Sequence, residues 1–280
     1  MTRCGSLRAS AALMLLVALA VPAPAHAAEP VREPRLVLIG GGTRPAEAMA
    51  RFVEWAGGVQ ARVLVVPWAS GEPKESCEAI LQDLAPYHPA AAECAPAAVL
   101  DRGGKAAPLA PARSKAFLEA LARATGVFFT GGDQGRVMDV LADPALLAAV
   151  RARYEASAVF GGTSAGTAIM SRTMITGDGD FTVIDSGRVG VRPGLGLLDG
   201  IILDQHFVKR QRENRLFGLV LASPAERGAG IDEGTALLVT GGRAAEVVGT
   251  SVVVLVDAAG ADRLSITLLR PGQRVDLRGR

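Results

Sequence analysis

The sequence predicts an α/β fold: a three-layer αβα sandwich around a mostly parallel central sheet, with an antiparallel β extension at its C-terminal end. Short apolar runs alternate with helix-like stretches through the first two-thirds of the chain. This is the pattern of β-α units that feed a parallel sheet covered on both faces. From Gly230 onward the pattern changes to valine-rich runs separated by glycine pairs and turn residues, which is typical of antiparallel strands.

The individual elements follow from these runs. We expect parallel strands where an apolar run ends at Gly, Pro or Thr: Leu36–Ile39, Val63–Val66, Val127–Phe129 and Ala158–Phe160. Helical patterns cover Ala46–Ala56, Lys74–Ala85, Pro111–Ala124, Arg136–Leu141 and Pro144–Tyr154. The antiparallel strands are expected at Ala236–Val239, Ala245–Val248 and Ser251–Val256. No internal repeat or long linker interrupts this order, so residues 28–280 are expected to form a single catalytic domain.

Residues 1–27 have the composition of a secretory signal peptide. Arg3 and Arg8 precede an apolar run from residue 11 to residue 21, and the small-residue site Ala25-His26-Ala27 follows. A transmembrane helix needs about 20 apolar residues, so an uncleaved membrane anchor is the minor alternative. We therefore expect an exported protein, periplasmic or extracellular, without a membrane partner after cleavage.

Composition and charge limit the classes of partner. The chain has 280 residues, 49% of them hydrophobic and 21% charged, which excludes disordered and collagen-like proteins. Its formal charge of +2 falls to zero once residues 1–27 are removed, because they carry two arginines and no acid. A nucleic-acid partner is therefore not expected. Cys77 and Cys94 remain in the exported chain, where a disulfide and two free thiols are both open.

The strongest local motif is Gly162-Thr163-Ser164-Ala165-Gly166, which lies between an apolar run and a helix-like stretch. A serine on a tight strand-to-helix turn has its hydroxyl exposed, and the flanking glycines let neighbouring backbone approach closely. Ser164 is therefore predicted to be a nucleophile. The alternative is that Ser164 only caps the helix.

A serine nucleophile requires a base, usually histidine. After export only two histidines remain: His88 in a proline-bracketed loop, and His206 at the end of an apolar run. His206 is the candidate base, because active-site loops follow the strands of a parallel sheet. The acid that orients the imidazole could be Asp204 or one of the pair Asp232-Glu233, and the residues alone leave these alternatives open.

Two further features could contribute to the site. Backbone amides at Gly132, in the turn after Phe129, and at Ala165, after the nucleophile, could bind an oxyanion. Arginine side chains bind carboxylates with paired hydrogen bonds, so Arg210, Arg212 and Arg215 suit a substrate rich in carboxylates. All three can point inward only if a helix begins after Arg210, and a solvated helix face is the alternative. The sequence contains no metal-ligand spacing and no complete dinucleotide fingerprint, so neither a metal nor a cofactor is expected.

Four segments together resemble the cyanophycinases: residues 129–134, residues 162–166, residues 204–216 and residues 231–236. Cyanophycinases belong to one serine peptidase family with the aspartyl dipeptidase called peptidase E, and their fold is similar to that of class I glutamine amidotransferases. The resemblance implies that Ser164 is the nucleophile, His206 the base and Glu233 the orienting acid. It also places Gln134, Asp204, Arg210, Arg212 and Arg215 around the substrate, and it suggests a homodimer.

The resemblance also implies a substrate. Cyanophycin has a polyaspartate backbone with arginine on each side-chain carboxyl, and cyanophycinases cut it to β-aspartyl-arginine dipeptides. We therefore expect an exported serine peptidase, acting through an acyl-enzyme on cyanophycin or on related aspartyl or β-aspartyl peptides. Two alternatives stay open: an α/β-hydrolase-like esterase, whose chain order is serine, acid, histidine, and a non-catalytic protein that binds aspartyl peptides. The exact peptide, and the choice between end-trimming and internal cleavage, are not determined by the sequence.

Overall fold

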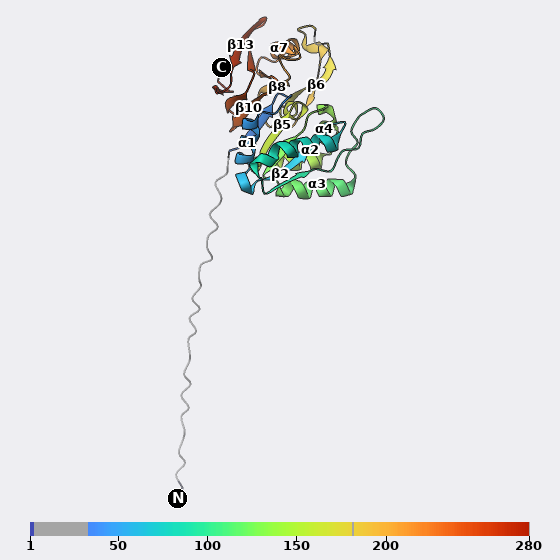
Figure 1. Cartoon of the computed structure of the whole chain (residues 1–280), viewed down its shortest axis with the longest axis vertical. Helices are drawn as coiled ribbons and strands as arrows, with labels where there is room; N and C mark the ends of the chain where they lie inside the picture. The colour runs from blue at the N-terminus through green and yellow to red at the C-terminus, as the bar shows by residue number, and fades with distance from the viewer. Residues whose placement is uncertain (3–32, 181, 280) are drawn as a thin grey trace. The chain divides into compact units, whose positions relative to one another are not determined.

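The computed structural model describes residues 1–2, 33–180 and 182–279. Apart from its first two residues, the predicted signal peptide lies outside this range. Figure 1 shows the folded part of the chain, in which α2 and α3 lie at one end and α7, β8 and β13 at the other. No helix among the described residues combines the length and the apolar character needed to cross a bilayer.

An eight-stranded sheet forms the centre of the fold, in the order β14-β11-β10-β1-β5-β4-β2-β3. Five neighbouring strands are parallel: β1 (Arg35–Ile39), β5 (Val159–Thr163), β4 (Gly126–Phe129), β2 (Arg62–Val66) and β3 (Ala91–Cys94). Three antiparallel strands extend it: β10 (Thr235–Thr240), β11 (Ala244–Gly249) and β14 (Arg274–Asp276). The four predicted parallel strands are thus confirmed.

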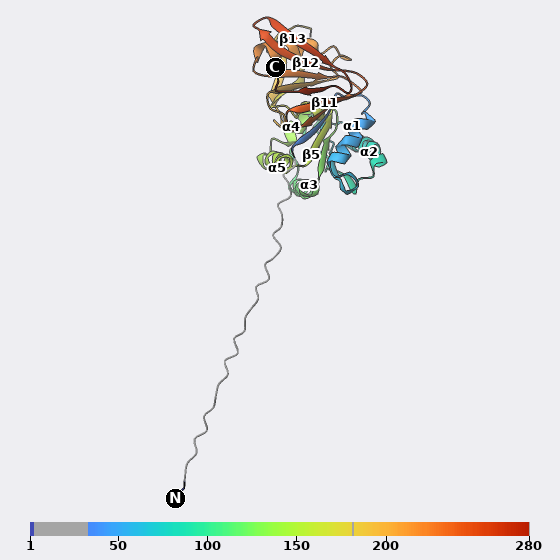
Figure 2. The same ribbon diagram turned by 90° about the vertical axis from the view of Figure 1, so that its left-hand side faces the viewer.

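Helices cover both faces of this sheet, as the predicted sandwich requires. Helices α1 (Ala46–Trp55) and α2 (Pro73–Leu84) pack with Val37 and Ile39 of β1 in one buried cluster. Leu36 and Leu38 of the same strand face a second cluster with three other helices: α3 (Pro111–Arg123), α4 (Gln134–Val140) and α5 (Pro144–Glu155). Successive residues of a strand point to opposite faces, so one apolar strand serves both layers. Figure 2 shows α1 and α2 on one side of β5, and α5 on the other.

Helix bounds agree with the sequence pattern to within about two residues. Helix α4 begins earlier than predicted, at Gln134, because the Asp133 carboxylate accepts a hydrogen bond from the Gly135 amide (2.7 Å) and caps the helix. Three short 3₁₀ turns complete this part of the chain: η1 (Gly58–Gln60), η2 (Ala85–Tyr87) and η3 (Ser186–Arg188).

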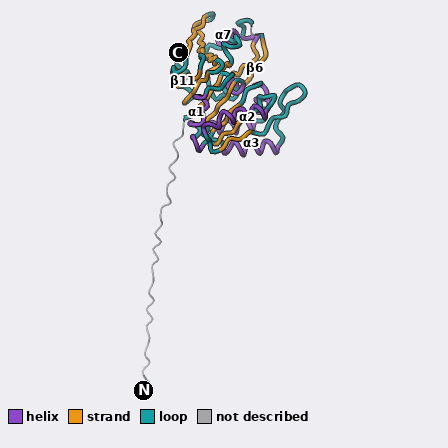
Figure 3. Tube along the Cα trace, in the orientation of Figure 1, coloured by secondary structure: helices purple, strands orange, loops and turns teal. Residues whose placement is uncertain are grey.

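The predicted C-terminal antiparallel strands are confirmed, and they divide between two sheets. The run 251–256 does not continue the central sheet but belongs to β12 (Val253–Gly260) of a second sheet, whose order is β13-β12-β9-β8. The chain changes sheets at Gly249, where φ is +112° and a Cβ would lie 2.3 Å from the Gly234 oxygen. Only glycine fits such a close approach at positive φ. Figure 3 shows this strand-rich C-terminal part beside the helix-covered part of the chain.

The other strands of the second sheet are β13 (Arg263–Leu269), β9 (Arg227–Ile231) and β8 (Ile201–Gln205). Helix α7 (Glu213–Ala222) connects β8 to β9, which pair in parallel. A separate pair of strands, β6 (Thr173–Gly179) and β7 (Val189–Pro193), forms an arm before β8.

The structure joins Cys77 of α2 to Cys94 at the end of β3 by a disulfide, with 6.1 Å between the Cα atoms. Of the two states that the sequence left open, the bridged one is therefore present. The bridge closes a loop with a sequence separation of 17. By loop-closure entropy it stabilises the fold by about 3 kcal/mol, and it ties α2 to the outermost parallel strand.

Candidate active site

The predicted site residues meet where β1, β4 and β5 end. Parallel strands bring their carboxyl ends to one edge of a sheet, and loops there form the usual site of an α/β protein. Here the loops carry Gly40–Gly42, Gly131–Gly132 and Ser164. His206 comes from the second sheet, directly after β8, and its backbone N–H donates to the Gly40 oxygen (2.7 Å). The site therefore lies between the two sheets.

Ser164 sits on a strained turn between β5 and the short helix α6 (Ala165–Ala168). Its φ is +53° and its ψ −115°, a conformation that costs a non-glycine residue about 1–3 kcal/mol. The neighbouring backbone leaves no room for side chains: a Cβ on Gly162 would lie 2.3 Å from the Gly166 carbonyl, and one on Gly166 would lie 2.2 Å from the Phe129 oxygen. The Ser164 side chain makes no capping bond. The geometry is that of a nucleophile elbow, not of a helix cap.

His206 bridges the serine and Glu233. Its Nε2 lies 2.8 Å from the Ser164 Oγ, and its Nδ1 lies 2.5 Å from the Glu233 Oε1. The imidazole packs on Gly41, where a Cβ would lie 2.3 Å from the His206 Cε1. Of the acids left open by the sequence, Glu233 is the one that contacts the histidine. The acid thus follows the histidine in the chain, unlike the order of an α/β-hydrolase esterase.

Burial governs the charge of this imidazole. Burial lowers the pKa of His206, the Glu233 hydrogen bond opposes that shift, and the nearby Arg210 charge lowers it further. The net direction is downward from the usual value, so His206 is neutral at pH 7. A neutral imidazole can accept a proton, as a general base requires.

Asp204 has a different partner from the one expected. Its carboxylate accepts two hydrogen bonds from the guanidinium of Arg215, from Nε at 2.7 Å and from the Nη2 group, and both side chains are 1% exposed. Asp204 is thus neither the acid beside His206 nor free to bind substrate. Helix α7 begins after Arg210, at Glu213, as inward-facing arginines require. Even so, the charge of Arg215 is neutralised by Asp204.

The other predicted substrate residues line the site in different ways. Arg212 donates to the Gln205 backbone oxygen (2.9 Å), whereas Arg210 is about half exposed, with its Nε 3.9 Å from Glu233 Oε1. The Gln134 amide donates to the Ile175 oxygen of β6 (2.8 Å), so it supports the arm. Arg210, Arg212 and Gln134 all line one cleft beside Ser164.

Gln205 and Thr167, both near Ser164, were missed by the sequence analysis, and Asp232, one of the acids considered beside His206, has a different role. The Ser164 hydroxyl also lies 3.2 Å from the Gln205 Oε1. The buried Thr167 hydroxyl lies within hydrogen-bond distance of the Ile39 oxygen (2.7 Å) and the Gly162 oxygen (2.8 Å), which ties the elbow to β1. The Asp232 carboxylate accepts from the backbone amides of residues 208 and 209 and from the Ser251 hydroxyl, so it fixes the loop after His206. For Gln205, its position next to His206 in the sequence was the only signal that it lies in the site.

The two backbone amides predicted to bind an oxyanion are available. Neither the Gly132 N–H nor the Ala165 N–H has a hydrogen-bond acceptor within the described part of the chain. Gly132 has φ +137°, and a Cβ there would lie 2.1 Å from the Ala69 oxygen, so this turn requires glycine. Both amides adjoin Ser164 in space or in sequence.

Two clefts meet at Ser164. One, of about 480 Å³, is lined by residues of α4, the arm and the arginine cluster. The other, of about 330 Å³, is lined by Gly41, Arg44 and Ser76 among others. Gly132, Ser164 and Arg210 belong to both. A peptide can therefore extend to both sides of Ser164.

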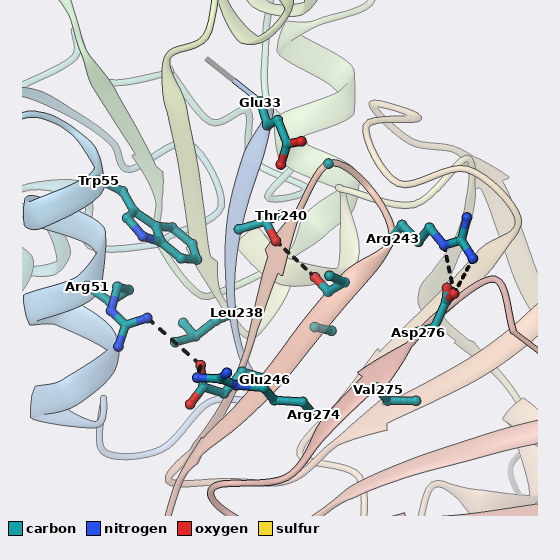
Figure 4. A pocket seen from close by; sticks show the side chains of 13 residues that line it. Glu33, Arg51, Trp55, Leu238, Thr240, Arg243, Glu246, Arg274, Val275 and Asp276 are labelled. Carbon is teal, nitrogen blue, oxygen red and sulfur yellow. Dashed lines mark hydrogen bonds and ion pairs between the residues drawn. The ribbon is translucent and has the colours of Figure 1, made fainter.

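A larger cavity, of about 710 Å³, lies at the opposite end of β1 and β10. Among the described residues, no serine, cysteine or histidine lines it. Its charged groups are largely paired with one another (Figure 4), as in Arg243 with Asp276 and Arg274 with Glu246. It therefore lacks the serine and histidine that the cleft at Ser164 brings together. In the described residues, no group of three or more His, Cys, Asp or Glu side chains is arranged to hold a metal ion.

Residues 36–247 match peptidase family S51. The chain belongs to this family. It is 33% identical over 229 residues to the cyanophycinase of Synechococcus elongatus, a match that covers 79% of this chain and 67% of that protein. The cyanophycinase of Geminocystis herdmanii is also 33% identical, with 79% of this chain and 80% of the relative covered. The S51 member described here is thus a cyanophycinase-like peptidase of serine type.

Solved structures agree on the fold. A peptidase from an acI-B1 actinobacterium matches with a TM-score of 0.66 at 20% identity, over 88% of this chain and 98% of that one. A putative peptidase E of Listeria monocytogenes EGD-e matches with a TM-score of 0.51 at 15% identity, over 85% of this chain and all of that one. Both share the architecture described above.

We predict that Asp204→Asn lowers the free energy of unfolding by about 3 kcal/mol or more, because it leaves the buried Arg215 charge without its partner. Denaturant titration measures the change. Asp199→Asn is the matched control, since its pair with Arg172 is mostly exposed, and it should cost less than about 1 kcal/mol. An Asp204→Asn variant of full stability that binds substrate poorly would instead make Asp204 a substrate contact.

We predict that the His206 imidazole titrates below its usual pKa and that Arg210→Gln raises that pKa. The substitution removes a positive charge that opposes protonation and leaves the Glu233 carboxylate less screened. NMR titration of the ring protons measures both values. Arg243→Gln, an equal change of charge at the far end of the sheet, should leave the titration unchanged. A pKa at or above the usual value in the unsubstituted protein would contradict the dominance of burial.

Proposed function

We propose that this peptidase is an exported cyanophycinase-type enzyme that hydrolyses cyanophycin or related aspartyl or β-aspartyl peptides and releases β-aspartyl-arginine. Its nucleophile is Ser164, its base His206 and its orienting acid Glu233. The observation that carries the proposal is the imidazole of His206, held within hydrogen-bond distance of both other side chains.

In the first half-reaction, the Ser164 Oγ attacks the scissile carbonyl while His206 Nε2 accepts its proton. Glu233 accepts a hydrogen bond from the Nδ1–H, which fixes the tautomer and stabilises the imidazolium that forms. The carbonyl oxygen becomes an oxyanion, and the backbone amides of Gly132 and Ala165 donate to it. His206 then gives its proton to the leaving amine, and an acyl-enzyme remains.

In the second half-reaction, water takes the place of the amine. His206 removes a proton from the water as it attacks the acyl carbon, and then returns a proton to Ser164. The turn that holds Ser164 supports both steps, because it keeps the Ser164 Oγ beside His206 Nε2 without rearrangement of the backbone.

The charge of the larger cleft at Ser164, of about 480 Å³ and called the main cleft below, supports the substrate class. Arg210 and Arg212 line it close to the nucleophile, and the charge of Arg215 is already balanced by Asp204. Guanidinium groups bind carboxylates with good geometry. Each unit of cyanophycin carries a carboxylate on its arginine, so this cleft can bind one unit beside the scissile bond.

Export is proposed from the sequence of residues 1–27 and is supported by the Cys77–Cys94 disulfide, since disulfides persist in oxidising compartments. An exported enzyme would act on polymer released by other cells.

We predict that the purified protein releases β-aspartyl-arginine from cyanophycin and that Ser164→Ala lowers the rate by about 10⁴-fold or more. Mass spectrometry of the soluble products measures release. Ser114→Ala is the control: Ser114 lies in α3, its hydroxyl donates to the Leu109 oxygen, and it lines neither cleft at Ser164, so the full rate should remain. Full activity of Ser164→Ala would overturn the mechanism. No release by the folded wild type, with turnover of simple acyl esters, would overturn the substrate class and favour an esterase.

We predict that protein secreted by an expressing bacterium begins at Ala28, because cleavage is expected after Ala25-His26-Ala27. N-terminal sequencing of the exported fraction checks this. Replacement of the apolar residues 13–17 by polar ones should keep the chain in the cytoplasm uncleaved. Export of an intact chain that begins at Met1 would contradict the proposal.

A further inference from the structure

The arm formed by β6 and β7 is held over the main cleft. Its residues Thr176, Gly177 and Asp178 line that cleft. Gln134 of α4 donates to the Ile175 oxygen on β6, and Arg192 of β7 binds the Asp139 carboxylate of α4 at 3.0 Å. Both strands of the arm are therefore tied to the same helix, and this fixes the position of Asp178 at the cleft.

Asp178 is the carboxylate of this cleft that no cation neutralises. In the described part of the chain, three acids line the cleft: Asp133, Asp139 and Asp178. Asp133 caps α4 and lies 3.9 Å from Arg136, and Asp139 pairs with Arg192. Asp178 accepts a hydrogen bond from the neighbouring Thr176 hydroxyl (3.3 Å), and among the described residues no Lys, Arg or His lies within ion-pair distance of it.

Six cationic residues line the same cleft among the described residues: Lys105, Arg136, Arg192, Arg210, Arg212 and Arg215. Arg136, Arg192 and Arg215 pair with Asp133, Asp139 and Asp204, whereas Lys105 has no carboxylate within ion-pair distance in the described part of the chain. Arg210 and Arg212 adjoin the nucleophile, with Arg210 3.9 Å from Glu233 and Arg212 bonded to the Gln205 oxygen. The cleft thus has a cationic region next to Ser164 and a single available carboxylate on the arm. A ligand that fits both regions carries a negative and a positive group at once.

We propose that Asp178 is a specificity-determining residue that binds the guanidinium of the substrate's arginine side chain. This inference rests on the proposed function and adds to it the residue that selects a basic side chain. A β-aspartyl-arginine unit carries a free carboxylate and a guanidinium at the two ends of its arginine. The carboxylate binds Arg210 and Arg212, and the guanidinium reaches the arm, where a carboxylate accepts its paired N–H groups.

Gln134 also lines this cleft, but it is a weaker candidate than Asp178 for binding the guanidinium. Its amide nitrogen is already bound to the Ile175 oxygen, so it holds the arm rather than supplying charge. A neutral amide oxygen also binds a guanidinium less strongly than a carboxylate does. Asp178 is therefore the group in this cleft that distinguishes a charged side chain from a neutral one of the same shape.

The test compares two oligomers that differ only in charge: one of β-aspartyl-arginine units, and one in which citrulline replaces each arginine. We expect the wild type to cleave the arginine oligomer with a kcat/KM about tenfold higher. Asp178→Asn should lower kcat/KM for the arginine oligomer about tenfold, mostly through KM, and leave the citrulline oligomer unchanged within about twofold. Asp178→Glu should restore much of the preference.

Asp180→Asn is the matched control. It removes the same charge from the same arm, but Asp180 bonds Thr182 and does not line the cleft, so the preference should stay. Equal loss on both oligomers in Asp178→Asn would show a structural role and overturn the inference, as would a wild-type preference that the substitution leaves intact. Those results leave the proposed function standing, whereas a folded wild type that cleaves neither oligomer would overturn both.

Discussion

The close approach of the two sheets at the end of β1 is the constraint on which the site depends. His206 belongs to the second sheet and Ser164 to the first, so they meet only if the backbones come into contact. A Cβ on Gly40 would lie 2.2 Å from the Asp232 oxygen, and one on Gly41 would lie 2.3 Å from the His206 ring. The glycines after β1 thus allow the docking, and the hydrogen bond from His206 N–H to the Gly40 oxygen fixes it. A side chain at either position would separate Ser164 from His206.

The electrostatics of the site follow from the same contact. Docking buries Asp204, Arg215 and most of Arg212 beneath the imidazole, and each buried charge then needs a partner. Asp204 neutralises Arg215, whereas burial lowers the pKa of Arg212 to about 10. The remaining positive potential acts with burial on His206 and keeps it neutral. The arginine cluster therefore has two electrostatic effects: it places positive charge at the cleft, and it opposes protonation of His206.

The sequence was sufficient for the parts of the fold that depend on local patterns. Apolar runs identified the parallel strands, and the Gly-flanked Ser164 identified the elbow, because strand alternation and turn sterics act over a few residues. Long-range pairings were not accessible in this way. The sequence could not place residues 251–256 in a second sheet, nor show that Asp204 faces Arg215. Gln205 was missed because successive side chains of a strand point to opposite faces, so Gln205 and His206 are not expected to meet. The φ of +50° at His206 breaks that alternation, and both side chains reach Ser164.

The chain order of serine, histidine and acid is a consequence of topology. Strands β8 and β9 are parallel neighbours joined through α7, and their last residues, Gln205 and Ile231, are paired in register. The residues that follow the two strands must then lie side by side, which places His206 next to Asp232 and Glu233. Asp232 fixes the loop after the histidine, and Glu233 reaches its Nδ1. In an α/β-hydrolase the acid precedes the histidine. Here a second sheet supplies both partners through one crossover, so the acid comes last.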